Sequence, residues 1–187
     1  MTISLIFNFE ELAEKLNLLK IIQVKTNEQK RHIRELFWEY LNSANLMFSR
    51  EFDISFDVNA FLEQDITKLQ QFAPPEGRLL LGEYETKIAG CACLRKIGGD
   101  VGEIKRMYVK PEFRKKGIGR SLLQAIIHEA RQIGYSKIRL DTAPFAKEAQ
   151  ALYRSLGFQE IEPYAESEIP EKYRPSWVFM EFMLQPY

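Results

Sequence analysis

Two glycines among basic residues could hold a phosphate group. They are Gly117 and Gly119 in the segment RKKGIG, residues 114–119, which leads into the clearest helical pattern of the chain, residues 117–133. The first amides of a helix have no partner inside it, and the helix dipole adds partial positive charge at that end. Because glycine has no Cβ, an anion can approach the backbone closely. The segment predicts a phosphate site, although a lone G-x-G can also be a solvated basic loop.

Two familiar phosphate loops do not fit this segment. A P-loop has Lys and then Ser or Thr after its last glycine, whereas Gly119 is followed by Arg120 and Ser121. A dinucleotide fingerprint has a third glycine, and Leu122 stands in that place. The loop therefore belongs to another kind of anion site.

The positive charge of the chain is concentrated around this loop. The whole sequence holds 26 Lys and Arg against 26 Asp and Glu, so it carries no net charge. Residues 105–120 contain seven basic residues and only Glu112 as an acid, a net charge of +6, which leaves −6 on the rest. A local positive field on a mildly acidic protein favours one compact polyanionic ligand over a nucleic acid or a membrane surface.

Hydrophobic periodicity predicts the elements that position the loop. A short amphipathic helix over residues 10–20 forms an N-terminal extension, residues 1–20, and residues 21–187 form one domain. Strands are predicted at residues 21–25, 78–84, 87–95, 101–109, 137–141 and 177–184. A further strand is predicted to follow a turn at Gly157 and to extend through Ile161. Helices are predicted from Thr26 or Asn27 to Phe48 and over residues 57–71, 117–133 and 147–156. This order indicates an α/β fold, a mixed sheet with helices on both faces.

The sequence gives no sign of a metal site, an exported protein or a membrane span. Cys91 and Cys93 lie two apart on a strand, so their side chains share a face, and we expect them to pack against neighbours. Together with His32 and His128 they show no ligand spacing for zinc. The apolar runs are too short for a bilayer, and the first residues lack the basic region of a signal peptide. We expect a cytoplasmic protein without a metal.

Three blocks of sequence resemble the GNAT superfamily of acetyl-CoA-dependent acetyltransferases, over roughly residues 21–184. EIKRMYVKPEFRKKGIGR, residues 103–120, is similar to the central strand and pyrophosphate loop of that family. IRLDT, residues 138–142, resembles the next strand, and AQALYRSLGF, residues 149–158, resembles the A-x-x-L-Y-x-x-x-G-F block. The resemblance implies a twisted mixed sheet of about seven strands with splayed central parallel strands, and acetyl-CoA or CoA as the cofactor.

The resemblance also implies which residues hold the cofactor. The pantetheine arm would lie like an extra strand in the gap between residues 103–109 and 137–141, at the strand ends where such sheets bind ligands. Its partners would be the backbone of Met107, Tyr108 and Val109, and an amide near there would stabilise the oxyanion. The pyrophosphate would meet the loop and the first helical turn, namely Arg114, Lys115, Lys116, Gly117, Ile118, Gly119, Arg120 and Ser121. The family often has an Asn seven residues before the helix Tyr, and Ala146 stands there in this chain, which puts that contact in doubt.

Two side chains are candidates for proton transfer. By the resemblance Tyr153 would protonate the departing thiolate, since a phenol has a pKa of about 10; the alternative is a core aromatic beside Leu152 and Leu156. Glu103 stands eleven residues before Arg114, where some members carry a Glu that accepts the amine proton, directly or through water. In a half-buried cleft its pKa would be raised to suit that task; the alternative is a surface or cross-strand carboxylate.

The acceptor is expected to be a primary amine of a small molecule or a protein, which attacks acetyl-CoA directly in a ternary complex. The resemblance puts its pocket near residues 36–48 and 164–177. Aromatic side chains there would line it unless they are core residues: Phe37, Trp38, Tyr40, Tyr164 and Tyr173. A CoA-binding sensor or scaffold is the rival function, and a nucleic-acid-binding domain is a third, although the loop glycines would have no purpose there. The frequent dimers of the family favour a homodimer.

Overall fold

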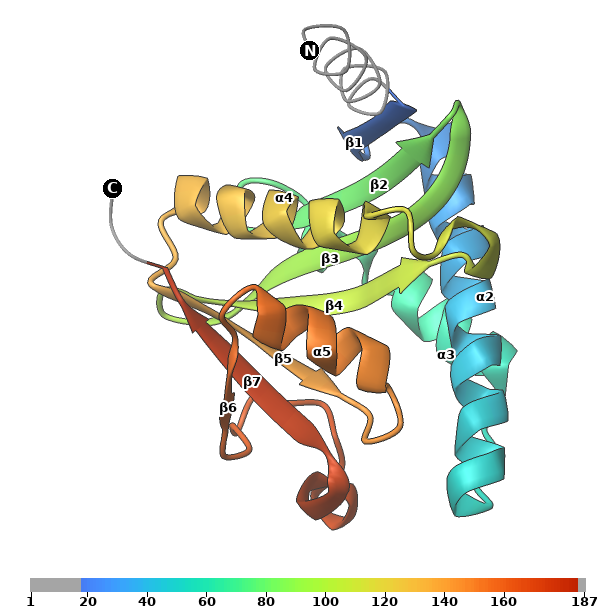
Figure 1. Cartoon of the computed structure of the whole chain (residues 1–187), viewed down its shortest axis with the longest axis vertical. Coiled ribbons are helices and arrows are strands. Elements are labelled where there is room, and N and C mark those ends of the chain that lie inside the picture. The colour runs from blue at the N-terminus through green and yellow to red at the C-terminus, as the bar shows by residue number, and fades with distance from the viewer. Residues whose placement is uncertain (1–17, 185–187) are drawn as a thin grey trace, which may run out of the picture.

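The computed structural model describes residues 18–184, which build one open sheet of seven strands in the order β1-β2-β3-β4-β5-β7-β6 (Figure 1). The strands are β1 (Leu19–Gln23), β2 (Arg78–Tyr84), β3 (Lys87–Gly98), β4 (Val101–Val109), β5 (Lys137–Thr142), β6 (Gln159–Ile161) and β7 (Val178–Met183). Neighbouring strands are antiparallel except β4 and β5, which are parallel. The predicted mixed sheet is confirmed.

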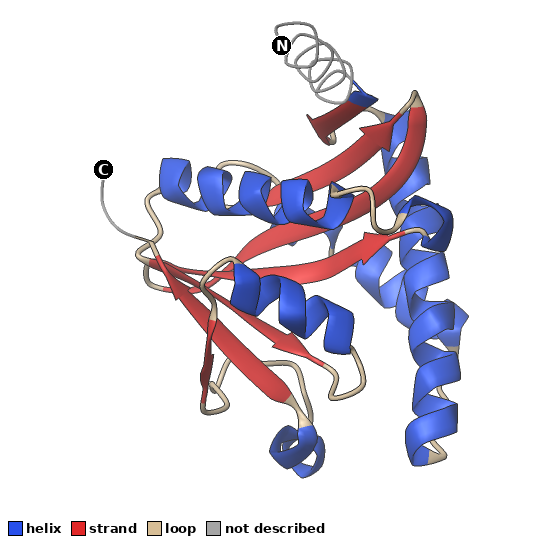
Figure 2. Cartoon of the chain, in the orientation of Figure 1, coloured by secondary structure: helices blue, strands red, loops and turns tan. Residues whose placement is uncertain are grey.

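Helices cover both faces of the sheet. Those described are α2 (Asn27–Phe52), α3 (Val58–Thr67), α4 (Ile118–Ile133) and α5 (Lys147–Ser155). Figure 2 shows α4 and α5 in front of the sheet and α2 and α3 on its other side. Each face buries its own core, with Leu122 and Ile138 under α4 and α5, and Phe37 and Cys93 under α2 and α3. Among residues 18–184, no helix has the length and the apolar character that crossing a membrane requires.

Helix α4 begins and ends at glycines. Gly117 precedes its first turn at φ +81°, and Gly134 follows its last turn at φ +94°, both in the left-handed region that glycine adopts without strain. Between them an apolar stripe that includes Leu122, Ile126 and Ala130 is completely buried against the sheet. The stripe fixes the rotation of α4, so its N-terminus is held beside the end of β4.

Several predicted boundaries were wrong by a few residues. Residues 19 and 20, expected to end the N-terminal helix, belong to β1, and residues 10–17 of that predicted helix lie outside the described residues. Helix α2 continues to Phe52, four residues past Phe48, where Phe52 packs against Phe48 and Phe145. The predicted helix 57–71 is divided into α3 and a 3-10 turn, Leu69–Phe72.

The two parallel strands separate after a short contact. Strand β4 pairs with β5 only from Val101–Lys137 to Glu103–Arg139, whereas β4 continues to Val109 and β5 to Thr142. Figure 1 shows the two arrows diverging toward their tips. The predicted splay of the central strands is confirmed, and it leaves the last two thirds of β4, residues 104–109, without a strand partner on the β5 side.

A β-bulge lies in β4 where this separation begins. Lys105 pairs with Cys93 and Tyr108 with Cys91, so two residues of β4, Arg106 and Met107, stand opposite Ala92. Arg106 has φ +50°, in the left-handed region. The sequence prediction of an uninterrupted strand over residues 101–109 missed this bulge. The visible signal was the adjacent pair Lys105-Arg106, which breaks the alternation of polar and apolar residues.

Candidate active site

The gap between β4 and β5 brings together three of the predicted groups. Met107 and Val109 at the end of β4 pack against the core under α4 and α5, as does Tyr153 of α5. The N-terminus of α4 follows β4 after a short connection that contains the 3-10 turn Pro111–Phe113. Figure 1 shows α4 and α5 on the same side of the diverging strands. The Tyr153 hydroxyl lies 3.7 Å from Met107 Sδ, which places it at the end of β4.

The loop before α4 has the backbone of an anion cradle. Lys115 at φ +62° and Gly117 at φ +81° both lie in the left-handed region, which turns successive amides toward one side. An added Cβ at Gly117 would have no heavy atom within 4 Å, so the space over this residue is open. An added Cβ at Gly119 would meet Leu152 of α5 at 3.4 Å. The residues present therefore fit a phosphate group, with Gly117 at the open surface and Gly119 against α5.

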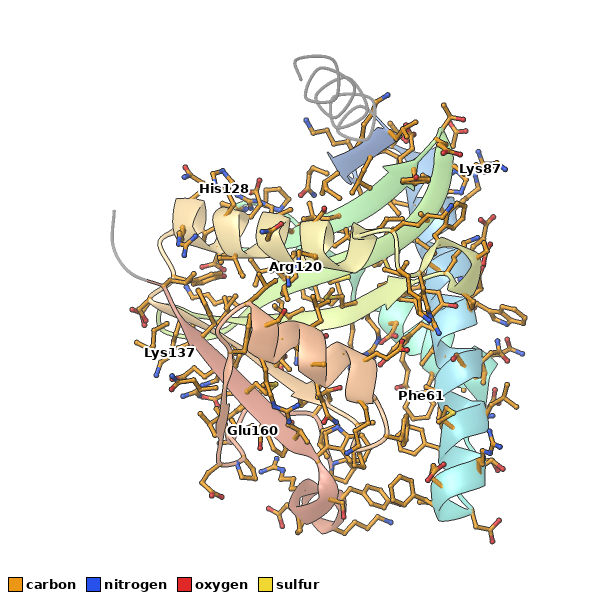
Figure 3. All side chains as sticks on the ribbon, viewed as in Figure 1. Phe61, Lys87, Arg120, His128, Lys137 and Glu160 are labelled. Carbon is orange, nitrogen blue, oxygen red and sulfur yellow. The ribbon has the colours of Figure 1, made fainter. Side chains whose placement is uncertain are left out.

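The basic side chains around the loop divide into two groups. Lys105, Arg106 and Lys110 form ion pairs with carboxylates on the α2 and α3 side of the sheet, so they contribute little to the predicted field of +6. The basic side chains beyond β4 and Lys110, those of Arg114, Lys115, Lys116 and Arg120, are exposed. Arg114 donates from Nε to the carbonyl of Val109 at 3.2 Å, Arg120 donates to Ser155 Oγ at 2.9 Å, and the Lys116 ammonium stands 4.7 Å from the Tyr84 ring centroid. Figure 3 labels Arg120 between α4 and α5.

Tyr153 lies beside Met107, at the gap between β4 and β5. Its side chain is buried, and its hydroxyl donates to Met107 Sδ at 3.7 Å, a weak acceptor. Burial raises the pKa of Tyr153, and the nearby Tyr40 and Asp141 raise it further. The hydroxyl therefore keeps its proton at neutral pH, with no strong hydrogen-bond partner to compete for it.

Glu103 lies on β4 directly opposite Arg95 of β3, the cross-strand position that the sequence analysis gave as the alternative to a half-buried cleft. It is completely buried, and both carboxylate oxygens are engaged. Oε2 accepts from Arg95 at 2.6 Å, and Oε1 accepts from the Tyr164 hydroxyl at 2.7 Å. The correction has a simple cause: the loop between β6 and β7 folds over this face and covers the carboxylate, which the local sequence of β4 does not reveal.

Glu103 belongs to a charged network that the sequence analysis missed. Lys105 lies 3.4 Å from both Asp141 and Glu168, and Arg95 binds Glu168 at 2.8 Å. Although partial burial favours the neutral acid, Lys105 and Arg95 lower the pKa of Glu168 to about 2. The network joins β3, β4, β5 and the loop before β7, segments far apart in the sequence. The only local signal was Glu103 and Lys105, two apart on one strand and therefore on one face.

The comparisons with known proteins agree with this geometry. The model of the Acetyltransferase (GNAT) family matches residues 31–158. This chain belongs to the GNAT family. The predicted family and enzyme class, an acetyl-CoA-dependent acyltransferase, are therefore confirmed, as is acetyl-CoA as the cofactor of the family.

Two relatives and one solved structure illustrate the similarity. An uncharacterized N-acetyltransferase of Schizosaccharomyces pombe is 31% identical over 81% of this chain and 90% of its own length. The uncharacterized N-acetyltransferase YsnE of Bacillus subtilis is 39% identical over 73% of this chain and 84% of its own length. The crystal structure of the PaiA N-acetyltransferase of Thermoplasma acidophilum in complex with coenzyme A superimposes with a TM-score of 0.67 at 17% identity, over 88% of this chain and 98% of that one.

The departure from the frequent GNAT pattern at Ala146 is visible in the structure. Ala146 precedes α5, and no side chain caps that helix. Gln150, buried in α5, instead donates from Nε2 to the carbonyl oxygens of Ala143 at 2.9 Å and Pro144 at 3.3 Å. The amide that stabilises this loop thus comes from four residues further along the chain, which sequence reasoning did not identify.

The five aromatic residues expected to line the GNAT acceptor pocket differ in burial and in the neighbours that they contact. Phe37 is completely buried in the core, so it lines no pocket, and Trp38 is 48% exposed. Tyr40 packs edge-on against Tyr108, and Tyr164 is buried against Glu103; Tyr173 is partly buried in the 3-10 turn Glu171–Ser176.

An aromatic cluster near the end of β5 joins the two segments, residues 36–48 and 164–177, in which the acceptor pocket was expected, although its side chains were not named individually. Phe48 of α2 stacks on Trp177 with ring centroids 5.5 Å apart and meets Phe145 edge-on at 5.4 Å. Trp177 directly precedes Val178, which pairs with Thr142, the last residue of β5. The cluster therefore joins α2 to the carboxyl end of β5.

The two cysteines are buried structural residues. Burial raises the pKa of Cys91 to about 12 and that of Cys93 well above its ordinary value. A thiol with so high a pKa is a poor nucleophile at neutral pH. Within residues 18–184, no group of three or more His, Cys, Asp or Glu side chains is arranged to hold a metal ion.

Proposed function

We propose that this protein transfers the acetyl group of acetyl-CoA directly to a primary amine of a small molecule or a protein. One observation carries the proposal: the bulge and the splay of β4 turn Met107 toward the hydroxyl of Tyr153, beside the open N-terminus of α4. When bound, acetyl-CoA supplies the activated acetyl thioester. The residues of this chain bind it, exclude water and supply or remove protons.

The cofactor would be held by backbone groups at two places. The amides and carbonyls of Met107, Tyr108 and Val109, left without β5 as partner, would hold the pantetheine arm. The amides of the left-handed turn at Lys115 and Gly117 and the first turn of α4, with Ile118, Gly119 and Ser121, would hold the pyrophosphate. The exposed Arg114, Lys116 and Arg120 would add positive charge.

Tyr153 would act as the general acid. Its buried hydroxyl is protonated at neutral pH and has only a thioether as acceptor. A departing thiolate is a stronger acceptor than a thioether, so the proton would move toward the sulfur of CoA.

Glu103 would remove the amine proton only through a neighbouring group. Its two oxygens are occupied by Arg95 and Tyr164, so an amine has no free oxygen to approach. The Tyr164 hydroxyl, which donates to Glu103, is the group that would pass the proton on. The rival assignment, a carboxylate that only orders its neighbours, predicts that Glu103→Gln leaves the pH profile of kcat/KM unchanged.

Calorimetric titration with acetyl-CoA and with CoA tests the cofactor site. Gly117→Glu places a carboxylate in the space over the loop, so we expect at least a hundredfold loss of affinity, about 2.7 kcal/mol. Gly99→Glu is the matched control, because Gly99 also has a positive φ, +50°, and open space around an added Cβ, but lies in the turn between β3 and β4. Equal binding by the two variants would refute the assignment.

The acceptor, the cellular location and the partners of this protein remain predictions from the sequence. If the wild type binds acetyl-CoA, a screen of primary amines with Tyr153→Phe as the comparison separates an enzyme from a CoA-binding sensor. A sensor would bind acetyl-CoA without turnover of any amine. A cytoplasmic location, a homodimer and the absence of a nucleic-acid partner belong to the same proposal.

A further inference from the structure

Arg106 has a backbone conformation that residues with a Cβ rarely adopt. Among the described strand residues other than glycine, it alone has a positive φ, +50°. In the left-handed region the Cβ crowds the backbone, so such residues persist where their surroundings hold them. No glycine occupies the position, so something else must stabilise the bulge.

Asp65 of α3 holds the Arg106 side chain by both of its oxygens. Arg106 donates from Nε to Asp65 Oδ2 at 2.6 Å and from one terminal nitrogen to Oδ1 at 2.7 Å. Both side chains are largely buried, with 18% and 14% of their areas exposed. The Tyr40 ring centroid lies 5.8 Å from the guanidinium, and Cys91 Sγ donates to the Arg106 carbonyl at 3.3 Å. A two-point bond of this kind fixes orientation as well as distance.

The bulge determines which side chains at the end of β4 face α4 and α5. Before it, Ile104 packs under α4, while Lys105 faces the opposite side with Cys93. In a regular strand Met107 would then point with Lys105, and Tyr108 would point toward α4. The extra residue reverses this order, because Met107 packs under α4 and α5 while Tyr108 packs under α2 and α3. The contact between Met107 and Tyr153 therefore depends on the bulge.

We infer that Asp65 is a positioning residue for acetyl transfer: its two-point bond to Arg106 holds the β4 bulge, which sets Met107 and the adjacent backbone against Tyr153 in the cofactor gap. The inference rests on the proposed function for its effect on acetyl-CoA. The structural part, control of Met107 by a residue on the far face of the sheet, stands independently.

Asp65→Ala, with Glu63→Ala as the matched control, tests the inference. Both residues lie on α3 and both pair with an arginine, but Glu63 binds the exposed Arg34 on α2. We expect Asp65→Ala to weaken acetyl-CoA binding about tenfold and Glu63→Ala less than twofold.

The methyl NMR signal of Met107 gives a second measurement. Met107 is one of five methionines, and its signal is expected to shift in Asp65→Ala but not in Glu63→Ala, because its neighbour Tyr153 is an aromatic ring. Urea denaturation identifies folded variants, and Asp65→Asn replaces Asp65→Ala if that variant does not fold.

A second pair of variants separates the effect of the backbone conformation at the bulge from the effect of the ion pair. Arg106→Gly and Arg106→Ala both remove the bond to Asp65, but only glycine adopts φ +50° without strain. We expect Arg106→Gly to bind acetyl-CoA several-fold more tightly than Arg106→Ala, and Asp65→Ala to have no further effect in the Arg106→Gly protein. Equal affinities of the two Arg106 variants would contradict the inference.

The outcomes distinguish this inference from the proposed function. If the wild type binds no acetyl-CoA, the proposed function fails, while the Met107 signal still reports whether Asp65 controls the bulge. If the wild type binds and a folded Asp65→Ala keeps both its affinity and its Met107 signal, the inference fails and the proposed function stands.

Discussion

The two faces of the sheet at the β4–β5 gap are built in different ways. On the α4 and α5 face, the candidate site comes mostly from one stretch, residues 107–121, with Tyr153 added from α5. On the opposite face, charged side chains come from β3, β4, β5 and the loop before β7. The site proposed on the first face would bind the cofactor through backbone amides, whose positions follow local conformation. The second depends on pairs of buried charges, where the loss of one partner leaves the other uncompensated.

This difference predicts opposite responses to substitution. A change on the cofactor face should lower binding or turnover and leave the fold intact. A change in the charged network should lower the stability of the fold. The substitutions below test that division, beginning with the largest expected effect.

Removal of Arg95 should produce the largest loss of stability. Arg95→Met leaves Glu103 buried without its closest cation, so we expect the free energy of unfolding to fall by about 3–5 kcal/mol in urea denaturation. The double variant Arg95→Met with Glu103→Gln should recover part of that loss, because the unpaired charge is gone. Arg154→Met is the control: its pair with Glu160 is exposed, and we expect a change of about 0.5 kcal/mol or less. Similar losses for Arg95→Met and Arg154→Met would contradict the role of burial.

Tyr153→Phe should lower turnover without a loss of stability. It removes only a hydroxyl whose partner is a thioether, so the free energy of unfolding and the affinity for CoA should change little. If Tyr153 is the general acid, kcat should fall about a hundredfold, about 2.7 kcal/mol in the barrier. Unchanged kcat with an active amine acceptor would remove Tyr153 from the mechanism.

Glu168 should make the smallest of these contributions to the stability of the fold, and that contribution should depend on pH. Its pKa of about 2 in the folded protein lies below the ordinary value of 4.5, so its stabilising effect is present above pH 4.5 and is lost as the pH falls toward 2. The difference in unfolding free energy between the wild type and Glu168→Gln should shrink over that range. Because 43% of the side chain is exposed, solvent screens its pairs, and we expect less than about 2 kcal/mol at neutral pH. A difference that stays constant from pH 5 to 2.5 would show that the charge of Glu168 is not the cause.

Much of the cofactor face could be predicted because its signals are local. The apolar stripe of α4, the glycines at its start and end, and the basic loop before it lie within one continuous segment, and each acts through the conformation of its own backbone. Tyr153 was identified by the block around it. The bulge at Arg106 was missed although the pair Lys105-Arg106 breaks the polar–apolar alternation, because the sequence does not show where the pairing of β4 with β3 shifts.

The opposite face could not be predicted to the same depth. Glu103 was expected in a half-buried cleft, yet it is enclosed by Arg95 from β3 and Tyr164 from a loop 61 residues later. Asp65 was not considered at all, because a single acid on a helix surface is ordinary until its partner is known. These side chains acquire roles only through neighbours that the chain brings from elsewhere.

The sequence by itself determined the order of elements, the basic glycine loop before α4 and the family, because periodicity, glycines and motif spacing are properties of neighbouring residues. Only the tertiary structure decided the register of β4, the burial of Glu103 and the bond between Asp65 and Arg106. Those features depend on which distant charges meet inside the protein, where desolvation makes each pairing matter far more than it would in water.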